Sequence, residues 1–303
     1  MSNPTRVTVR VPGSTSNCGA GFDTLGLALQ LYNTVTLTPR TEAEIQPERE
    51  SDGRAMSLIE RMVQAFAAAT ETKTSGFTYR IDGDVPISRG LGSSVTVLAG
   101  VLAGLNRWAG DLLGDRDLVK LLTKIEGHPD NATAGFWGGF CISLCGHSAA
   151  DFEEIIRVEI PSSLKFVVAS PYLEIATKGS REVLPRQVSH GDATRSINSA
   201  AFLTAAITSG DFSKLRGAAF DFMHEPYRLP GIVGAADAIQ AGIRAGALTG
   251  WLSGSGSSVL CVANEAEAAT VGEAMHAAFA AADTSSRVQI LSADNAGLKI
   301  VSD

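Results

Sequence analysis

The segment VPISRGLGSS, residues 85–94, leads directly into the apolar run VTVLAGVLAGL. Glycine lets a backbone approach a ligand closely and adopt φ values that other residues avoid. The first N–H groups of a helix lack partners within the helix and carry the positive end of its dipole, so a phosphate fits there. Ser93 and Ser94 add hydroxyls that could bind phosphate oxygens or a magnesium ion. Because serine is also a favoured N-cap, a plain capped turn is an equal alternative.

Three other segments carry polar groups among small residues. The loop VPGSTSNCGAGFD (residues 11–23) holds Asn17 and Asp23, and WLSGSGSSV (251–259) would let a ligand or a second backbone come close. EGHPDN (126–131) follows an expected helix, and Pro129 should end that helix and leave the polar side chains on a loop. Glu126 could bind magnesium through oxygen. An irregular turn, a glycine hairpin and a solvated helix end are the corresponding structural alternatives.

Several functional classes are excluded or disfavoured. The sequence lacks GxxxxGK[ST], GxGxxG and GxSxG, and its five histidines and four cysteines show no zinc-binding spacing. A net charge of −7 disfavours a nucleic-acid partner. We expect no signal peptide and no membrane span, since no stretch approaches about 18 apolar residues. The scattered cysteines then suggest reduced, buried thiols in a cytoplasmic protein.

The hydrophobic pattern predicts an α+β protein of two lobes, residues 1–150 and 151–303, because strands and helices mix without strict βαβ alternation. The run at 95–108 is apolar nearly all round and predicts a central buried helix. Strands are expected at 6–11, 31–39, 76–81, 136–144, 155–160, 165–170 and 288–291, with a strand–turn–strand at 248–262. Further helices are expected at 55–70, 112–125, 177–184, 197–209, 212–219, 231–245 and 266–282.

Each motif is weak alone, but their order resembles the GHMP small-molecule kinases over nearly the whole chain. The shared features are PxxxGLGSS at 86–94, a glycine-rich loop near the N-terminus and SGSGSS at 253–258. SNCGAGFD, HPDN, TKGSREVLP (177–185) and HEPYR (224–228) resemble the branch of that family that acts on L-homoserine. The resemblance implies an N-terminal lobe similar to ribosomal protein S5 domain 2 and a ferredoxin-like C-terminal lobe. It also implies transfer of a phosphoryl group from ATP to the homoserine hydroxyl, giving O-phospho-L-homoserine for threonine synthesis.

The resemblance further implies a set of site residues. ATP, with Mg²⁺, would bind the phosphate loop, namely Pro86, Ile87, Ser88, Arg89, Gly90, Leu91, Gly92, Ser93, Ser94, Val95 and Thr96. The substrate would meet Asn17, Asp23, His128, Asp130, Asn131, Thr177, Arg181 and Arg228. Catalytic roles fall to Asn131, Glu126 and Ser94, and the metal ligands would be Ser94 and Glu126.

The chemistry of homoserine matches part of this set. Its ammonium needs an acid, which Asp23 supplies, and its carboxylate suits the planar guanidinium groups of Arg181 and Arg228. These arginines would otherwise lie on a solvated face or in a surface ion pair. Asn131 stands where other branches of the family carry an aspartate, so no catalytic base is evident there. Ser14 replaces a basic residue, and SGSGSS departs from the usual SGxGPT.

Two other functions remain open at this stage. One is a GHMP kinase for a different small amino-alcohol or hydroxy acid. The other is a catalytically idle protein of the same fold that binds a ligand as a regulator. For the partners, the resemblance implies small-molecule substrates and a homodimer.

Overall fold

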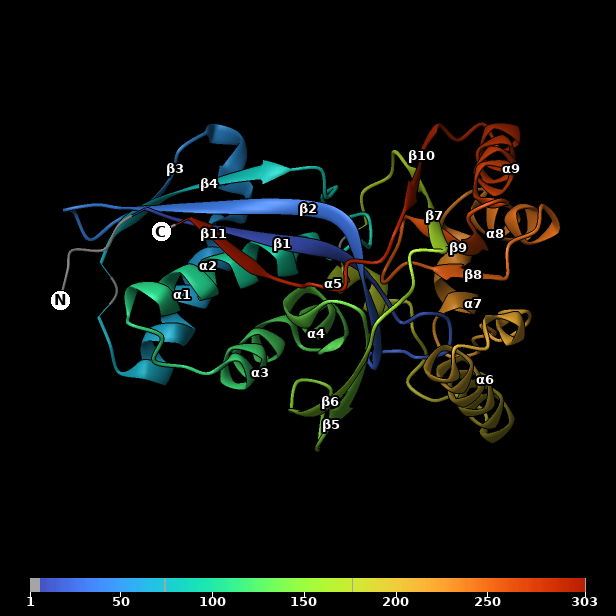
Figure 1. Cartoon of the computed structure of the whole chain (residues 1–303), viewed down its shortest axis with the longest axis horizontal. Coiled ribbons are helices and arrows are strands. Elements are labelled where there is room, and N and C mark those ends of the chain that lie inside the picture. Colours follow the sequence, from blue (N-terminus) through green and yellow to red (C-terminus); the bar gives the residue numbers. More distant parts are fainter. Residues whose placement is uncertain (1–5, 74, 176, 303) are drawn as a thin grey trace.

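The computed structural model describes residues 6–73, 75–175 and 177–302, and it has two lobes, each built on its own sheet (Figure 1). The larger sheet has seven strands, with the order β11-β1-β2-β4-β3 and with β5 and β6 continuing from β2. Its long central strand β2 pairs with β1 and β4 and, through its first residues, with β5. The seven strands are β1 (Val7–Ser16), β2 (Leu25–Pro39), β3 (Ile45–Pro47), β4 (Phe77–Gly83), β5 (Phe140–Cys145), β6 (Phe152–Val158) and β11 (Lys299–Ser302).

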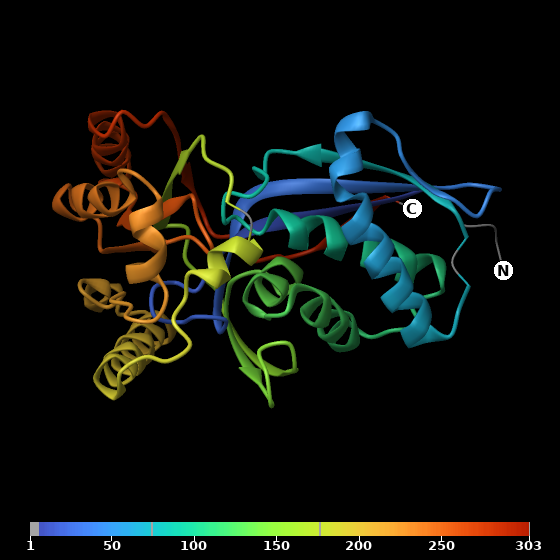
Figure 2. The same ribbon diagram turned by 180° about the vertical axis from the view of Figure 1, so that it is seen from behind.

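Helices cover one face of this sheet, as the view from behind in Figure 2 also shows. They are α1 (Met56–Thr70), α2 (Ser93–Trp108), α3 (Asp115–Glu126) and α4 (Asp130–Trp137). Every residue of α2 from Val95 to Asn106 is buried, which confirms the predicted central helix. A Cβ at Gly100 would lie 2.6 Å from the side chain of Val35, so this glycine permits the close approach of α2 to β2. The phosphate-loop segment is therefore anchored to the most buried helix of the lobe.

The second lobe contains an antiparallel four-stranded sheet in the order β10-β7-β9-β8. Two helices, α8 and α9, cover one side of it with an alanine-rich core, and α6 contributes to the core on the other side. This second core also takes in Leu25, Leu27 and Phe140 of the first lobe, so it joins the lobes. The elements are β7 (Leu164–Pro171), β8 (Thr249–Leu252), β9 (Val259–Asn264), β10 (Ser286–Leu291), α6 (His190–Ser209), α8 (Ala235–Arg244) and α9 (Ala268–Ala281).

Short helices make the connections around these layers. Two of them, α5 and α7, carry the arginines predicted to bind substrate. They are η1 (Glu50–Ala55), α5 (Thr177–Glu182), η2 (Phe212–Leu215), α7 (Glu225–Arg228) and η3 (Leu229–Gly231). The mixed α+β class with two lobes agrees with the prediction.

Local assignments differ from the predictions at several places. β1 continues through Pro12 and Gly13 as an irregular strand instead of turning there, because a register shift absorbs the proline. The predicted strand at 136–144 is the end of α4 followed by β5, with two left-handed glycines, Gly138 and Gly139, between them. The expected helix at 212–219 is only the 3₁₀ turn η2, since Gly217 has a φ of +73°. Strand β11 was not expected.

The proposed lobe boundary at residue 150 remains a prediction, because the sheets do not divide the chain at one point. β6 lies beyond residue 150 yet pairs with β5 in the first sheet. β11, at the far end of the described chain, returns to pair with β1. All four cysteines are free thiols, and three of them are buried. Among the described residues, none of the helices has the length and apolar character that a membrane crossing requires.

Candidate functional site

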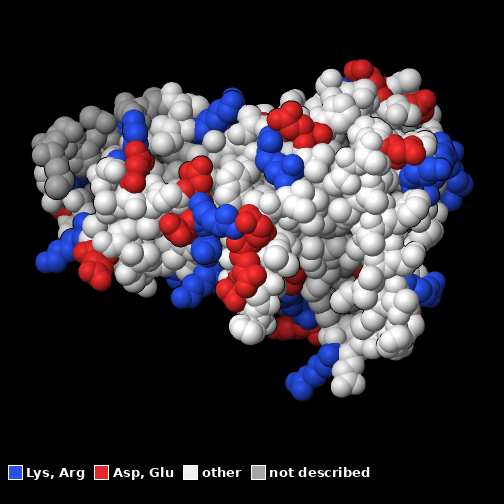
Figure 3. Space-filling view, turned by 60° about the horizontal axis from the view of Figure 1, so that its bottom comes forward, with Lys and Arg blue, Asp and Glu red and all other residues white. Residues whose placement is uncertain are grey.

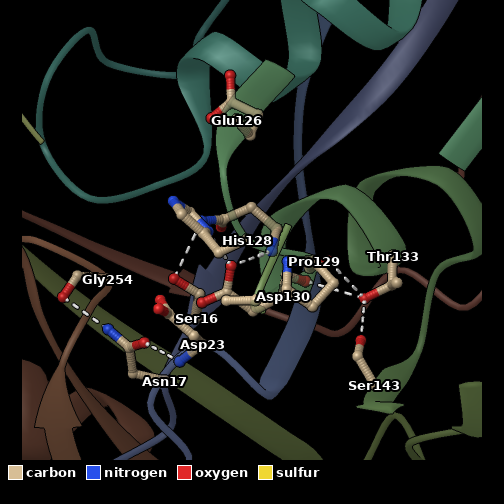
Figure 4. A network of polar contacts seen from close by, with 12 residues as sticks. Ser16, Asn17, Asp23, Glu126, His128, Pro129, Asp130, Thr133, Ser143 and Gly254 are labelled. Atoms are coloured by element: carbon tan, nitrogen blue, oxygen red, sulfur yellow. Dashed lines mark hydrogen bonds and ion pairs between the residues drawn. The ribbon is translucent and has the colours of Figure 1, made fainter. Parts of the chain in front are cut away.

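A cavity of about 470 Å³ receives side chains and backbone from both lobes. Its polar part is lined by substrate-site candidates of the sequence, together with the late loop at Gly254 and Ser255. These candidates are Asn17, Asp23, His128, Asp130, Asn131, Arg181 and Arg228. Figure 4 shows several of them facing one another, with Asn17 between Asp23 and Gly254 and with His128 beside Asp130.

The phosphate loop lines the same cavity through Ile87, Ser88, Arg89, Gly90, Gly92, Ser93 and Ser94. Gly92 is the N-cap of α2 with a φ of +70°, so Ser93 and Ser94 lie inside the helix and not at the cap. A Cβ at Gly90 would lie 2.0 Å from the carbonyl oxygen of Ser253 in the late loop. The glycines therefore bring two loops from different lobes together beside the start of a helix.

Four residues of the predicted phosphate loop are not among those that line the cavity. Leu91 and Val95 are buried in the hydrophobic cores. The Thr96 hydroxyl donates to the carbonyl oxygen of Ser93 and accepts from the amide of Asn33. Pro86, the first residue of the loop, is partly buried. Leu91 and Val95 anchor the loop to the hydrophobic cores, and Thr96 bonds to the first turn of α2.

The EGHPDN segment is a junction between two helices and not the loop that the sequence predicts. α3 ends at Glu126, Gly127 adopts a left-handed conformation, and Pro129 serves as the N-cap of α4. A proline that ends one helix can begin the next, because its missing N–H needs no partner there. Asp130 and Asn131 therefore occupy the first turn of α4 and point into the cavity from a fixed backbone.

His128 and Asp130 form a buried pair, with 2.6 Å between Nδ1 and Oδ1. Burial alone would lower the pKa of His128, but the charge and hydrogen bond of Asp130 outweigh it and raise this pKa to about 9. The pKa of Asp130 is lowered, since burial raises it but the charge and hydrogen bond of His128 prevail. A pKa of about 9 favours the protonated form of His128 at neutral pH.

Asn131 is held by two hydroxyls of β1. Its Nδ2 donates to Ser16 Oγ at 3.0 Å, and its Oδ1 accepts from Ser14 Oγ at 2.8 Å. A carboxamide does not titrate and cannot take the proton of a substrate hydroxyl. The two hydrogen bonds fix the orientation of the Asn131 side chain, and this side chain cannot act as a base.

The first glycine-rich loop positions Asp23 through an unusual backbone. Asn17 and Asp23 have φ values of +67° and +53°, and asparagine and aspartate tolerate this left-handed region better than most residues. The side chain of Asn17 donates to the carbonyl oxygen of Gly254 and accepts from the backbone N–H of Asp23. Asp23 then accepts two hydrogen bonds from Arg181, at 3.0 and 2.6 Å. The predicted acid and one predicted carboxylate clamp are thus paired with each other.

Arg228 is 6% exposed, so it is not the surface ion pair that was the alternative reading. Its Nε donates to the carbonyl oxygen of Ser180 at 3.1 Å, and Nη1 lies 3.3 Å from that of Gly254. Burial first, and the nearby charge of Arg181 second, lower the pKa of Arg228 to about 10. The guanidinium groups of Arg228 and Arg181 both lie over the Phe22 ring, about 5 Å from its centre.

Ser94 and Glu126, the predicted metal ligands, are joined by a hydrogen bond of 3.0 Å. Burial raises the pKa of Glu126, and the charge of His128 and this hydrogen bond oppose it. A hydroxyl and a half-buried carboxylate beside the phosphate loop form a donor set that suits Mg²⁺. Asp23, His128 and Asp130 also bring one potential ligand atom each within 4.8 Å, although each is engaged with Arg181 or with its neighbour.

Some cavity residues were missed by the sequence reading. They are apolar side chains and several polar groups, namely Asn33, Arg49, Ser51, Asp52, Arg54, Ala55, Leu58, Ile81, Val85 and Val97. They come from β2, η1, α1, β4 and α2, except for Arg49 just before η1 and Val85 just after β4, and they carry no common motif. Phe22 also lines the cavity, but no function was predicted for it from the GAGFD segment. Thr177 begins α5, and its side chain lies outside the described part of the structure.

Comparisons with known proteins agree with this geometry. The family model of the GHMP kinases N terminal domain matches residues 57–139 of this chain. The model of the GHMP kinases C terminal domain matches residues 203–281. Relatives that are 34–38% identical align with nearly the full length of this chain. The chain therefore belongs to the GHMP kinase family.

The relatives narrow the family to one branch. A homoserine kinase of Moorella thermoacetica is 38% identical, covering 97% of this chain and 99% of the relative. One of Deinococcus radiodurans is 34% identical, covering 98% of both chains. The crystal structure of a homoserine kinase from Cytophaga hutchinsonii superposes with a TM-score of 0.88 over 99% of both chains, at 24% identity. At this level of sequence identity, the similarity to the Cytophaga hutchinsonii structure shows only that the two chains share a fold.

Proposed function

We propose that this protein uses ATP to phosphorylate the side-chain hydroxyl of L-homoserine, giving O-phospho-L-homoserine. The observation that carries the proposal is one cavity in which a glycine loop at a helix N-terminus faces an acid and two arginines. An amino acid with a terminal hydroxyl supplies the charges that this acid and these arginines complement. A substrate of another GHMP kinase that lacks an ammonium group would have no use for Asp23.

The amino-acid end of the substrate would bind between the two lobes. Its ammonium group replaces Arg181 as a partner of Asp23, and its carboxylate lies between the guanidinium groups of Arg181 and Arg228. Both arginines already lie over Phe22 and line the cavity, although Arg181 must give up its hydrogen bonds to Asp23. Asn17 and His128 complete the polar wall, and the main chain at Gly254 lies beside it.

The triphosphate would bind where α2 begins. The backbone N–H groups from Gly90 to Ser94 and the positive end of the helix dipole favour its negative charge. The base would meet apolar side chains of the cavity such as Leu58, Ile81 and Val97. Ser94 and Glu126 would hold Mg²⁺, which would supply positive charge to offset that of the phosphates.

Rate enhancement in this site would come from positioning and charge. Asn131 orients the attacking hydroxyl, and its own amide is fixed by Ser14 and Ser16. The cation of His128 lies on the same side and favours the negative charge of the phosphoryl group. Since a loose transition state develops little negative charge on the attacking oxygen, a side-chain base is not essential.

A coupled ADP-release assay with L-homoserine, mevalonate and galactose tests this function. We expect turnover with homoserine, and at least a hundredfold lower kcat/KM with the other two alcohols. Turnover of another alcohol in place of homoserine would support the alternative GHMP kinase activity. ATP binding in a calorimeter without phosphorylation of any of them would support the idle regulator.

The assembly state is a separate proposal. The homodimer that the family resemblance implies is tested by light scattering of the purified protein at micromolar concentration. A mass of about twice 31.6 kDa supports it, and a monomer mass contradicts it.

A further inference from the structure

His224, in the HEPYR segment before α7, is fully buried and is not among the residues that line the cavity. Its two ring nitrogens connect elements that carry substrate-site residues. Nε2 lies 2.9 Å from the carbonyl oxygen of Gly19, in the loop that also bears Asp23. Nδ1 lies 3.5 Å from Nη1 of Arg228. The imidazole therefore stands between the proposed ammonium site and the proposed carboxylate site.

These contacts determine the proton position on the ring. A guanidinium can only donate, so Nδ1 must offer its lone pair to Arg228. A carbonyl oxygen can only accept, so Nε2 must carry the hydrogen that faces Gly19. The ring is then neutral and in a single tautomer. Burial and the charge of Arg228 lower the pKa of His224, against the opposing effects of Asp221, Asp23 and the Gly19 carbonyl.

The segment that carries His224 is fixed by Asp221. One carboxylate oxygen of Asp221 accepts from the backbone N–H groups of His224 and Glu225, each at 2.7 Å, and the other accepts from that of Met223. The Glu225 side chain accepts from the backbone N–H of Leu252, directly before the late loop. The imidazole is thus held at a defined position relative to both glycine loops.

The ring of His224 also stacks on Phe22, with 5.3 Å between the ring centres. Phe22 is the aromatic surface over which Arg181 and Arg228 lie. Displacing the imidazole would therefore shift Phe22, on which both guanidinium groups lie. It would also remove the contact of Nδ1 with Arg228.

We propose that His224 is a positioning residue for substrate recognition, which as a neutral imidazole links the Gly19–Asp23 loop to Arg228 and aims that guanidinium at the substrate carboxylate. This inference rests on the proposed function, because it concerns the amino-acid end of the same site. It assigns no contact between His224 and substrate.

Two substitutions separate the two links. In His224→Asn, the side-chain oxygen takes the place of Nδ1 and can still accept from Arg228, whereas the link to Gly19 is lost. In His224→Gln, the side-chain nitrogen takes the place of Nε2 and can still donate to Gly19, whereas the acceptor for Arg228 is lost. His276→Asn, at an exposed histidine of α9, is the matched control. Thermal unfolding of each variant reports whether it folds.

We expect both variants to raise KM for homoserine by roughly tenfold, which corresponds to about 1.4 kcal/mol, with KM for ATP changing less than twofold. The control should behave as the wild type. The effect of His224→Gln should largely vanish in an Arg228→Leu background, because the partner through which it acts is then absent.

Unchanged KM for homoserine in either folded variant overturns the inference and leaves the proposed function intact. So does a fall in kcat with both KM values unchanged, or an effect of His224→Gln that persists undiminished in the Arg228→Leu background. Absence of homoserine turnover by the wild type overturns the proposed function and this inference together.

Discussion

The ion pair between Asp23 and Arg181 is the central observation at the scale of single residues. Two hydrogen bonds join the Asp23 carboxylate to the Arg181 guanidinium. In the proposed complex, the substrate ammonium would pair with the carboxylate and the substrate carboxylate with the guanidinium. A ligand with both an ammonium and a carboxylate can open the pair and compensate each partner. A ligand with only one of these groups leaves the other partner unpaired in a partly buried site, which is costly. We therefore expect the pair to favour an amino acid as the ligand.

Asp23→Asn tests this selection. The change keeps the shape of the side chain and removes its charge, so the preference for homoserine over 4-hydroxybutanoate, which lacks the ammonium, should fall by roughly tenfold or more. The measurement is the ratio of kcat/KM values for the two alcohols. Asp237→Asn, on an exposed position of α8, is the control. An unchanged ratio in Asp23→Asn would remove this carboxylate from the ammonium site.

His128 gives a pH dependence of stability with a definite sign. Its pKa is about 9 in the folded protein and 6.5 in an ordinary environment, so between these values the folded state binds more protons than the unfolded state. The contribution is fully present below about pH 6.5 and is lost as the pH rises through about 9. It amounts to at most about 3 kcal/mol.

Urea unfolding of the wild type and His128→Gln at several pH values checks this prediction. The difference between their free energies of unfolding should be largest near pH 6 and should shrink toward pH 10. A difference that stays constant over this range would contradict the protonated pair with Asp130.

At the scale of elements, the site depends on where helices begin. α2 and α4 present Ser94 and Asn131 from their first turns, and α3 ends at Glu126. The sequence predicted the body of α2 because its apolar run is long. It did not predict α4, because Pro129 was read only as the end of a helix and the following apolar residues resemble a strand. Such a junction depends on tertiary packing, here against β1 and β2.

Gly90→Ala tests the contact between the phosphate loop and the late loop. Gly90 has a φ of +72°, and an added Cβ would collide with the carbonyl oxygen of Ser253. We expect kcat/KM for ATP to fall by more than tenfold, because one of the two loops must shift. Gly110→Ala is a close control, since Gly110 has a φ of +83° and open space around its Cβ position.

The control should lose about 1 kcal/mol of stability from backbone strain and keep its activity. Equal catalytic losses in Gly90→Ala and Gly110→Ala would show that backbone strain, and not the collision of the two loops, causes the effect.

At the scale of the whole molecule, the cavity exists because the two lobes share a core and meet over the loops. The motifs that resemble the GHMP kinases predicted the lobes, and they named Asp23, Arg181 and Arg228, which lie together although far apart in sequence. The apolar residues of the cavity could not be predicted, since side chains such as Leu58 and Ile81 have the pattern of ordinary core residues. The contacts of His224 with Gly19 and Arg228 could not be predicted either, because a buried histidine has no sequence signature.

The surface carries charges of both signs. On the face that Figure 3 shows, basic and acidic side chains lie beside one another, and a broad area in its right half is uncharged. The chemical specificity that we propose rests on charged groups in the cavity, where Asp23 pairs with Arg181 and His128 pairs with Asp130.

The most direct test of the account is to identify the product by ³¹P NMR. The full-length protein is incubated with ATP, Mg²⁺ and L-homoserine. We predict one new phosphomonoester signal, coupled to the methylene protons next to the former hydroxyl and growing in step with ADP. Consumption of ATP without this signal, or a phosphoryl group on any other atom of homoserine, would contradict it.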